Sequence, residues 1–137
     1  MVSAEVLSYF SRAQVTLHDF SPPMIEHARR RLAAFGDRVA FAHADMTADE
    51  WTKGLRGPFD LAVSAIAIHN LRKAGLIAQV YKDVRGVLKP GGVFLDADYP
   101  HGHGLDAHLD WLKQAGFTSV ECAQWDGHLA VMVARAK

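Results

Sequence analysis

Carboxylates follow three short apolar runs in this chain, and a histidine follows another. Asp19 comes after the run VTLH, Asp45 comes shortly after VAFAH, and Asp98 comes after VFLDA. His69 directly follows the run FDLAVSAIAI. An ionised carboxylate only accepts hydrogen bonds, so these acids suit a ligand that presents hydroxyl or amino groups. A histidine in such a place could take a proton near neutral pH, because its ordinary pKa is about 6.5.

The segments that carry these residues have the pattern of alternating strands and helices. Ser21 is a natural N-cap, and Pro22 suits the first helical position because its missing N–H would be unpaired there anyway. Apolar residues then recur every three or four positions until Gly36 ends the helix. The same signals predict strands at Gln14–Asp19, Val39–His43, Phe59–Ile68, Val93–Ala97, Ser119–Trp125 and His128–Arg135, and helices at Ser3–Arg12, Pro22–Phe35, Ala48–Lys53, Leu76–Leu88 and Leu105–Leu112.

This alternation predicts an α/β fold with an open, mostly parallel sheet and helices on both faces. The run Phe59–Ile68 does not alternate, which is typical of a strand that is covered on both faces. Asp126-Gly127 is the only connection expected between the last two strands and predicts a tight antiparallel β-hairpin. Ligands of such sheets bind beyond the carboxyl ends of the strands, where the acids and His69 lie.

Length and composition narrow the function classes. A chain of 137 residues suits one domain, and 15 basic residues balance 15 acidic ones. We therefore expect neither a nucleic acid nor a membrane as a partner. Cys122 is the only cysteine, and the N-terminus lacks the basic and apolar regions of a signal peptide, which favours a cytoplasmic location.

Five segments in a fixed order resemble the class I S-adenosylmethionine-dependent methyltransferases. They read HDFSPPMIEHA, AHADM, FDLAVSAIAIHNL, LKPGGVFL and WLKQAGF, and a closing hairpin follows them. Each segment alone is weak, but their order and spacing cover nearly the whole chain from about Val6. The resemblance implies a Rossmann-like sheet that ends in an antiparallel β-hairpin, and methyl transfer from S-adenosylmethionine, with S-adenosylhomocysteine as product, to a small-molecule substrate.

The resemblance also implies roles for particular residues. Asp19 would accept the ribose hydroxyls, Phe20 and Met24 would flank the adenine, and Asp45 would accept its amino group. The Met46 backbone N–H would face a ring nitrogen, and Ser64 and Ala65 would lie beside the methionine portion. His69 would be the catalytic base at the rim, toward the substrate.

Each role has a structural alternative. Asp19 could support the N-terminus of the following helix, and Asp45 could be a turn or cap residue. Met24 could belong to the core, and His69 could be a structural or solvent-facing histidine. A cluster of His101, His103 and His108 follows Asp98, but the spacing matches no established zinc pattern, so we expect a polar loop and no metal.

The chain departs from the family at its front. Family members begin with a strand and a glycine-rich loop about 20 residues before the ribose acid, but no glycine precedes Gly36 here. We therefore expect a single methyltransferase-like domain over residues 1–137 that lacks the family's central first strand. An open apolar edge would remain beside Gln14–Asp19 and beside Phe59–Ala65, and such edges favour association into a homo-oligomer.

Three functions remain in competition at this point. The first is methyl transfer to a small molecule. The second is a non-catalytic remnant or interaction module with weak or no cofactor binding, which the missing glycine loop favours. The third is another nucleotide-binding Rossmann-like enzyme, which shares the acid at the end of a strand but not the terminal hairpin.

Overall fold

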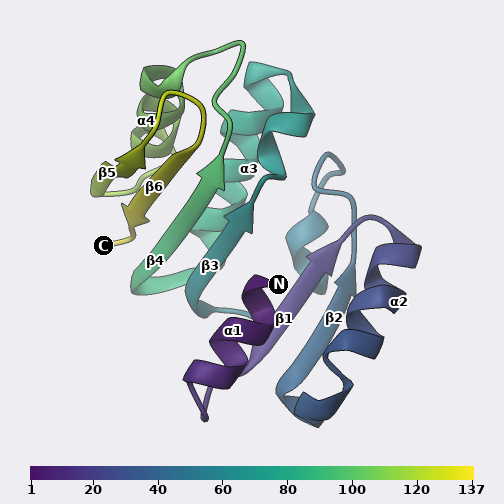
Figure 1. The fold of residues 1–137 in the computed structure, drawn as a ribbon. Coiled ribbons are helices and arrows are strands. Elements are labelled where there is room, and N and C mark those ends of the chain that lie inside the picture. Colours follow the sequence, from purple (N-terminus) through teal and green to yellow (C-terminus); the bar gives the residue numbers. More distant parts are fainter. The chain divides into compact units, whose positions relative to one another are not determined.

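The computed structural model describes residues 1–137, and these form two compact units, Met1–Arg56 and Gly57–Lys137 (Figure 1). Each unit has its own sheet, and the two sheets share no hydrogen-bonded strand pair. No helix has both the length and the apolar character that crossing a membrane requires.

The first unit is built on two parallel strands, β1 (Val15–Asp19) and β2 (Val39–His43). Their register pairs Val15 with Val39 and Asp19 with His43, so both strands end at the same edge. Helices α1 (Val2–Tyr9) and α2 (Pro22–Arg31) and the short 3₁₀ helices η1 (Ala33–Arg38) and η2 (Trp51–Gly54) complete the unit. The buried apolar residues of this unit are Leu7, Ile25, Ala28, Leu32 and Ala42.

Local chemistry fixes the ends of α2. The Ser21 hydroxyl accepts a hydrogen bond from the Met24 N–H at 3.4 Å, and Pro22 occupies the first helical position, as the sequence predicts. The α-helix ends at Arg31, earlier than expected, and the chain continues in η1 to a turn at Gly36, whose φ of 59° suits glycine. Arg38 then donates hydrogen bonds to carbonyl groups at the end of α1 and in the loop after it, namely those of Leu7, Phe10 and Ala13.

The second unit contains a four-stranded sheet in the order β3-β4-β6-β5 (Figure 1). Its strands are β3 (Phe59–Ala65), β4 (Leu88–Asp98), β5 (Ser119–Trp125) and β6 (Ala130–Arg135), and its helices are η3 (Ile68–Leu71), α3 (Ala74–Val87) and α4 (Leu105–Gln114). Strands β3 and β4 are parallel, whereas β4–β6 and β6–β5 are antiparallel. The expected α/β class and the closing β-hairpin are therefore confirmed.

The core of the second unit lies between the sheet and its two α-helices. Phe94 of β4 is 1% exposed, and its ring packs against Phe117 and against Tyr81 of α3. Helices α3 and α4 also contact each other. Alternation along β4 directs Phe94, Asp96 and Asp98 to one buried face. Two carboxylates therefore lie inside the packed layer.

Strands β1 and β3 belong to different sheets. Strand β1 is hydrogen-bonded only to β2, and β3 only to β4.

Three local predictions were wrong. Strand β3 is not covered on both faces, since Leu61 and Val63 are 40% and 42% exposed. The expected helix at Ala48–Lys53 is only the 3₁₀ turn η2. The β5–β6 connection has four residues instead of two, because the Asp126 carboxylate accepts hydrogen bonds from the N–H groups of His128 and Leu129 and widens the turn.

The LKPGG segment also differs from expectation, because it continues directly into β4 instead of preceding the strand. Leu88 already pairs with Phe59 of β3. A side chain at Gly92 would place its Cβ 2.9 Å from the Lys89 carbonyl oxygen and 3.2 Å from that of Phe59. Glycine is therefore needed at this position for the backbones to approach so closely.

Candidate functional site

The ends of β1 and β2 bring together Asp19 and the loop that carries Asp45. The Ala44 N–H donates to the Asp19 carbonyl oxygen at 3.2 Å. His18 Nε2 donates to the Ala44 carbonyl at 2.7 Å, and His43 Nε2 donates to the Phe20 carbonyl at 2.9 Å. Burial lowers the pKa of His18, so a neutral ring is favoured. The two strand ends are thus tied to each other by side chains as well as by the sheet.

Asp19 and Asp45 each close a local turn with one carboxylate oxygen. Asp19 Oδ1 accepts from the Ser21 N–H at 2.9 Å. Asp45 Oδ1 accepts from the Thr47 N–H at 2.8 Å and from its hydroxyl at 2.7 Å, and these bonds lower the pKa of Asp45. The alternatives of a helix support and a turn residue are therefore correct locally. Neither turn uses Oδ2, so each ionised acid keeps an oxygen for a ligand.

Apolar side chains lie exposed beside these acids. Phe20 is 67% exposed and Met24, in the first turn of α2, is 53% exposed, so Met24 is not a core residue. Met46 follows Asp45 and is half-buried. An exposed phenyl ring and a thioether next to free carboxylate oxygens suit a ligand with one flat apolar face and polar edges.

The other predicted residues lie in the second unit, at the end of β3. Ser64 pairs in register with Asp96, and Ala65 pairs with Ala97. Ser64 Oγ is buried, and its hydroxyl lowers the pKa of the neighbouring Asp96 carboxyl by hydrogen bonding. Ser64 therefore belongs to the polar surroundings of Asp96.

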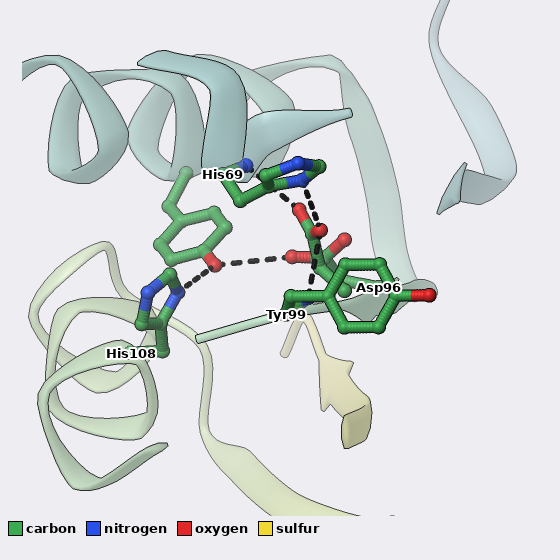
Figure 2. Close-up of polar contacts among 6 residues, drawn as sticks. His69, Asp96, Tyr99 and His108 are labelled. Carbon is green, nitrogen blue, oxygen red and sulfur yellow. Dashed lines mark hydrogen bonds and ion pairs between the residues drawn. The ribbon is translucent and has the colours of Figure 1, made fainter. Parts of the chain in front are cut away.

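His69 is held by a single carboxylate through two hydrogen bonds. Its Nδ1 donates to Asp98 Oδ1 at 2.6 Å and its backbone N–H donates to Oδ2 at 2.8 Å (Figure 2). The Tyr99 N–H gives Asp98 a third donor at 2.8 Å. Because Nδ1 carries its hydrogen toward Asp98, the lone pair of the neutral ring is on Nε2. The His69 side chain is 27% exposed, so the ring is partly open to solvent.

The turn that carries His69 is strained at both ends. Ile66 has φ 50° and Arg72 has φ 60°, a region that costs non-glycine residues about 1–3 kcal/mol. The Ile66 N–H is fixed by the Ala97 carbonyl at 2.8 Å. Such strain persists where the surrounding structure enforces it, and here it lets one short turn aim both donors of His69 at Asp98.

A second polar cluster lies deeper, among three elements of the second unit. The Tyr81 hydroxyl of α3 donates to Asp96 Oδ2 at 3.0 Å, and His108 Nδ1 of α4 lies 2.7 Å from the same hydroxyl (Figure 2). Since the phenol has one hydrogen and gives it to Asp96, Nδ1 of His108 donates to Tyr81. Burial raises the pKa of Tyr81 and lowers that of His108, so both favour their neutral forms.

Asp96 differs from Asp98, two residues along the same strand. Its Oδ2 accepts from the Tyr81 hydroxyl, and the Ser64 hydroxyl is the other polar side chain that lowers its pKa. Burial, and then the charge of Asp98, raises the pKa of Asp96 to about 7. Asp96 therefore holds a proton under mildly acidic conditions, whereas Asp98 has only N–H donors around it.

The three histidines after Asp98 have different surroundings. His101 stacks on Tyr99 with the ring planes 8° apart, His103 Nε2 donates to the Arg72 carbonyl at 2.7 Å, and His108 is buried. An open cavity of about 370 Å³ lies at this end of the unit, lined by His69, Arg72, His101, Gly102 and His103. His69 therefore borders a cavity that is large enough for a small molecule.

Comparison with known proteins decides the family. Residues 1–92 of the 137 match the family model described as "Methyltransferase domain". The chain belongs to the methyltransferase-domain family. This methyltransferase domain contains Asp19, Asp45 and His69 within the matched residues, and Asp96 and Asp98 lie beyond them.

Solved structures agree on the fold of this methyltransferase domain. The CurJ carbon methyltransferase superposes with a TM-score of 0.80 over 98% of the chain and 45% of its own length, at 15% identity. A methyltransferase from Pyrococcus furiosus superposes with a TM-score of 0.78 over 98% of the chain and 68% of its own length, at 16% identity. PigF, solved with SAH, superposes with a TM-score of 0.73 over 99% of the chain and 47% of its own length, at 14% identity. At these identities the likeness supports the Rossmann-like methyltransferase fold and no more.

Curated relatives are far longer than this methyltransferase domain. Squalestatin tetraketide synthase of Phoma sp. (strain C2932) is 32% identical over 84 residues, which are 61% of the chain and 3% of that protein. A squalestatin tetraketide synthase of Cochliobolus lunatus is 30% identical over 95 residues, which are 66% of the chain and 4% of that protein. The chain therefore spans only a few per cent of the length of these relatives.

The sequence singled out His69 and Asp98 separately, but it did not predict that they pair, and it did not predict the buried cluster. The alternation in the segment FLDAD was the available signal, because it places Asp96 and Asp98 on the same face as Phe94. Nothing in the sequence indicated that Tyr81 would meet both Asp96 and His108, which lie 15 and 27 residues further along the chain.

Proposed function

We propose that this domain transfers a methyl group from S-adenosylmethionine to a small-molecule acceptor, with His69 as the general base. The observation that carries the proposal is the His69–Asp98 pair, which keeps a lone pair on Nε2 at a residue that borders an open cavity. Membership in the methyltransferase-domain family supports the reaction class.

The chain's own residues fit the cofactor. Asp19 Oδ2 would accept hydrogen bonds from the ribose hydroxyls, while Phe20 and Met24 would pack on the adenine. Asp45 Oδ2 would accept from the adenine amino group, with the Met46 N–H at a ring nitrogen. When bound, S-adenosylmethionine supplies an electrophilic methyl group on a sulfonium.

His69 would prepare the acceptor for this transfer. Its Nε2 would take the proton of the acceptor's hydroxyl, amine or activated carbon, while Nδ1–H stays on Asp98. Asp98 would fix the tautomer and stabilise the imidazolium that forms. Asp98 touches only His69 and backbone N–H groups, so it is a positioning residue.

The first test is cofactor binding, measured by calorimetry with S-adenosylhomocysteine. We expect saturable binding that Asp19→Asn weakens about tenfold, because a neutral amide accepts less strongly than a carboxylate. Glu26→Gln, an exposed acid on α2, is the matched control and should bind as the unmodified protein does. Absence of binding at millimolar ligand would refute the proposal for this chain and favour the non-catalytic module.

The second test is methyl transfer to a panel of small acceptors. His69→Asn keeps an N–H that can reach Asp98 but loses the Nε2 lone pair, so kcat should fall about 10²–10⁴-fold with little change in cofactor affinity. His27→Asn, which changes an exposed histidine on α2, is the control. Cofactor binding without any transfer, or transfer that survives His69→Asn, would show that His69 is not the base.

A further inference from the structure

The cavity beside His69 is lined by basic side chains and one glycine. Its residues are one arginine, three histidines and a glycine, and none is acidic. We propose that this cavity binds the oxyanion of a small organic acid, a carboxylate or a phosphate ester, with Arg72 as its principal cation. The proposal names the class of methyl acceptor, and in that respect it rests on the proposed methyl transfer.

The Arg72 guanidinium is available for such a ligand. Arginine stays protonated at any physiological pH, and its planar fork matches a carboxylate or phosphate. The residue is exposed, and its side chain makes no hydrogen bond or ion pair with the 137 residues of the structure. The Arg72 backbone makes two hydrogen bonds: its N–H donates to the His69 carbonyl, and its carbonyl oxygen accepts from His103 Nε2.

The nearest buried carboxylate does not compete for this cation. Asp98 lies behind His69, is 0% exposed, and already accepts from the His69 imidazole and from two backbone N–H groups. Of the imidazoles that line the cavity, those of His69 and His103 already give an N–H to Asp98 and to the Arg72 carbonyl, so the His101 ring is the one that can donate to an anion. The Arg72 guanidinium is therefore the positive charge in the lining, with no acidic residue there to oppose it.

The backbone holds Arg72 in this place at a cost. Its φ of 60° is unusual for a residue with a Cβ, and an asparagine or glycine would adopt it more easily. Two hydrogen bonds maintain the conformation, from the Arg72 N–H to the His69 carbonyl and from His103 to the Arg72 carbonyl. The strain ties the cation and His69 into one rigid turn, so an anion on Arg72 would lie close to the base.

The ring of His101 adds a second feature of the acceptor. It is exposed and stacks on Tyr99 with centroids 5.7 Å apart. A flat apolar body next to the oxyanion would find an aromatic surface there. Benzoate and phenyl phosphate are therefore suitable probes, and benzamide is the neutral counterpart of benzoate.

The test is a titration of the isotope-labelled protein, followed by the amide signal of Gly102 and the imidazole signals of His101 and His103. No cofactor is added. We expect saturable shifts with benzoate or phenyl phosphate at roughly millimolar concentration and none with benzamide. The tighter of the two anions identifies the kind of oxyanion. Equal shifts with benzamide, or with sodium chloride alone, would overturn the proposal.

Substitutions assign the effect to one side chain. Arg72→Gln should weaken anion binding about tenfold, and Arg72→Lys should lose less because it keeps the charge without the fork. Lys73→Gln removes the adjacent exposed cation, which does not line the cavity, and should leave binding unchanged. Equal weakening by Arg72→Gln and Lys73→Gln would reduce the effect to general charge and refute a site at Arg72.

The outcomes separate this inference from the proposed function. Anion binding without binding of S-adenosylhomocysteine would keep the cavity assignment and reject methyl transfer by this chain. Cofactor binding and methyl transfer to neutral acceptors only, with no anion binding, would keep the proposed function and reject the organic acid as the acceptor.

Discussion

Replacement of Asp96 by asparagine should stabilise the protein, and the gain should increase with pH. Burial, and then the charge of Asp98, raises the pKa of Asp96 from 3.8 to about 7 in the folded state. Between these two values the folded protein holds a proton that the unfolded chain has lost, so the free energy of unfolding falls as pH rises. Above pH 7 the folded protein contains an ionised carboxylate whose Oδ2 accepts from the Tyr81 hydroxyl.

The magnitude follows from the two pKa values. One pKa unit corresponds to about 1.4 kcal/mol, so full ionisation of Asp96 costs the folded state about 4 kcal/mol. From pH 5 to pH 8 the same linkage gives a loss of about 2–3 kcal/mol. The amide of the substituted side chain would not ionise, and its carbonyl oxygen could still accept from Tyr81. The stability of Asp96→Asn relative to the unmodified protein should therefore rise by this amount over that range.

Urea unfolding at pH 5, 6, 7 and 8, followed by circular dichroism and tryptophan fluorescence, measures this difference. Asp110→Asn changes an exposed carboxylate on α4 and is the control, for which we expect little pH-dependent difference. A difference for Asp96→Asn that stays constant from pH 5 to pH 8 would mean that Asp96 is already ionised in the folded protein at pH 5. The reasoning from burial would then be refuted.

Two further substitutions test the packing of each unit. Gly92→Ala should lower the free energy of unfolding by about 1–3 kcal/mol, because the new Cβ would lie 2.9 Å from a backbone oxygen. Gly54→Ala is the control, since a Cβ there would have nothing within 4 Å and should be tolerated. Thermal unfolding compares the two variants, and equal losses of stability would contradict the close-approach argument. Arg38→Ala should release α1 from the first unit, since it removes three hydrogen bonds to carbonyl groups, and hydrogen exchange of the α1 amides should become faster. Unchanged exchange would show that the buried Leu7 alone holds the helix.

The sequence was sufficient for features that depend on neighbouring residues. Ser21 and Pro22 predicted the start of α2, and the runs before Asp19 and His43 predicted β1 and β2. Features that depend on side chains meeting across the fold could not be read in this way. The four-residue hairpin turn is an example, because the Asp126 carboxylate captures two N–H groups and outweighs the preference of Asp-Gly for a two-residue turn.

The same limit applies to the candidate site. His69 and Asp98 were recognised separately as residues at strand ends, but 29 residues separate them in the chain. Their meeting depends on the parallel pairing of β3 with β4 and on the strained turn from Ile66 to Arg72. Periodicity predicts strands and faces, whereas it carries no information on which side chains of two turns will share a hydrogen bond.

Asp96 and Asp98 show how one strand can prepare two carboxylates for different tasks. Both side chains are on the buried face of β4 and both residues are 0% exposed, so burial alone does not distinguish them. Their hydrogen-bond donors distinguish them. Asp98 accepts from three N–H groups, two of them from the backbone, whereas Asp96 accepts from the Tyr81 hydroxyl. Backbone donors suit an ionised carboxylate and do not depend on the identity of nearby side chains. The orientation of His69 is therefore built into the main chain of the turn and of β4, and it exists before any substrate arrives.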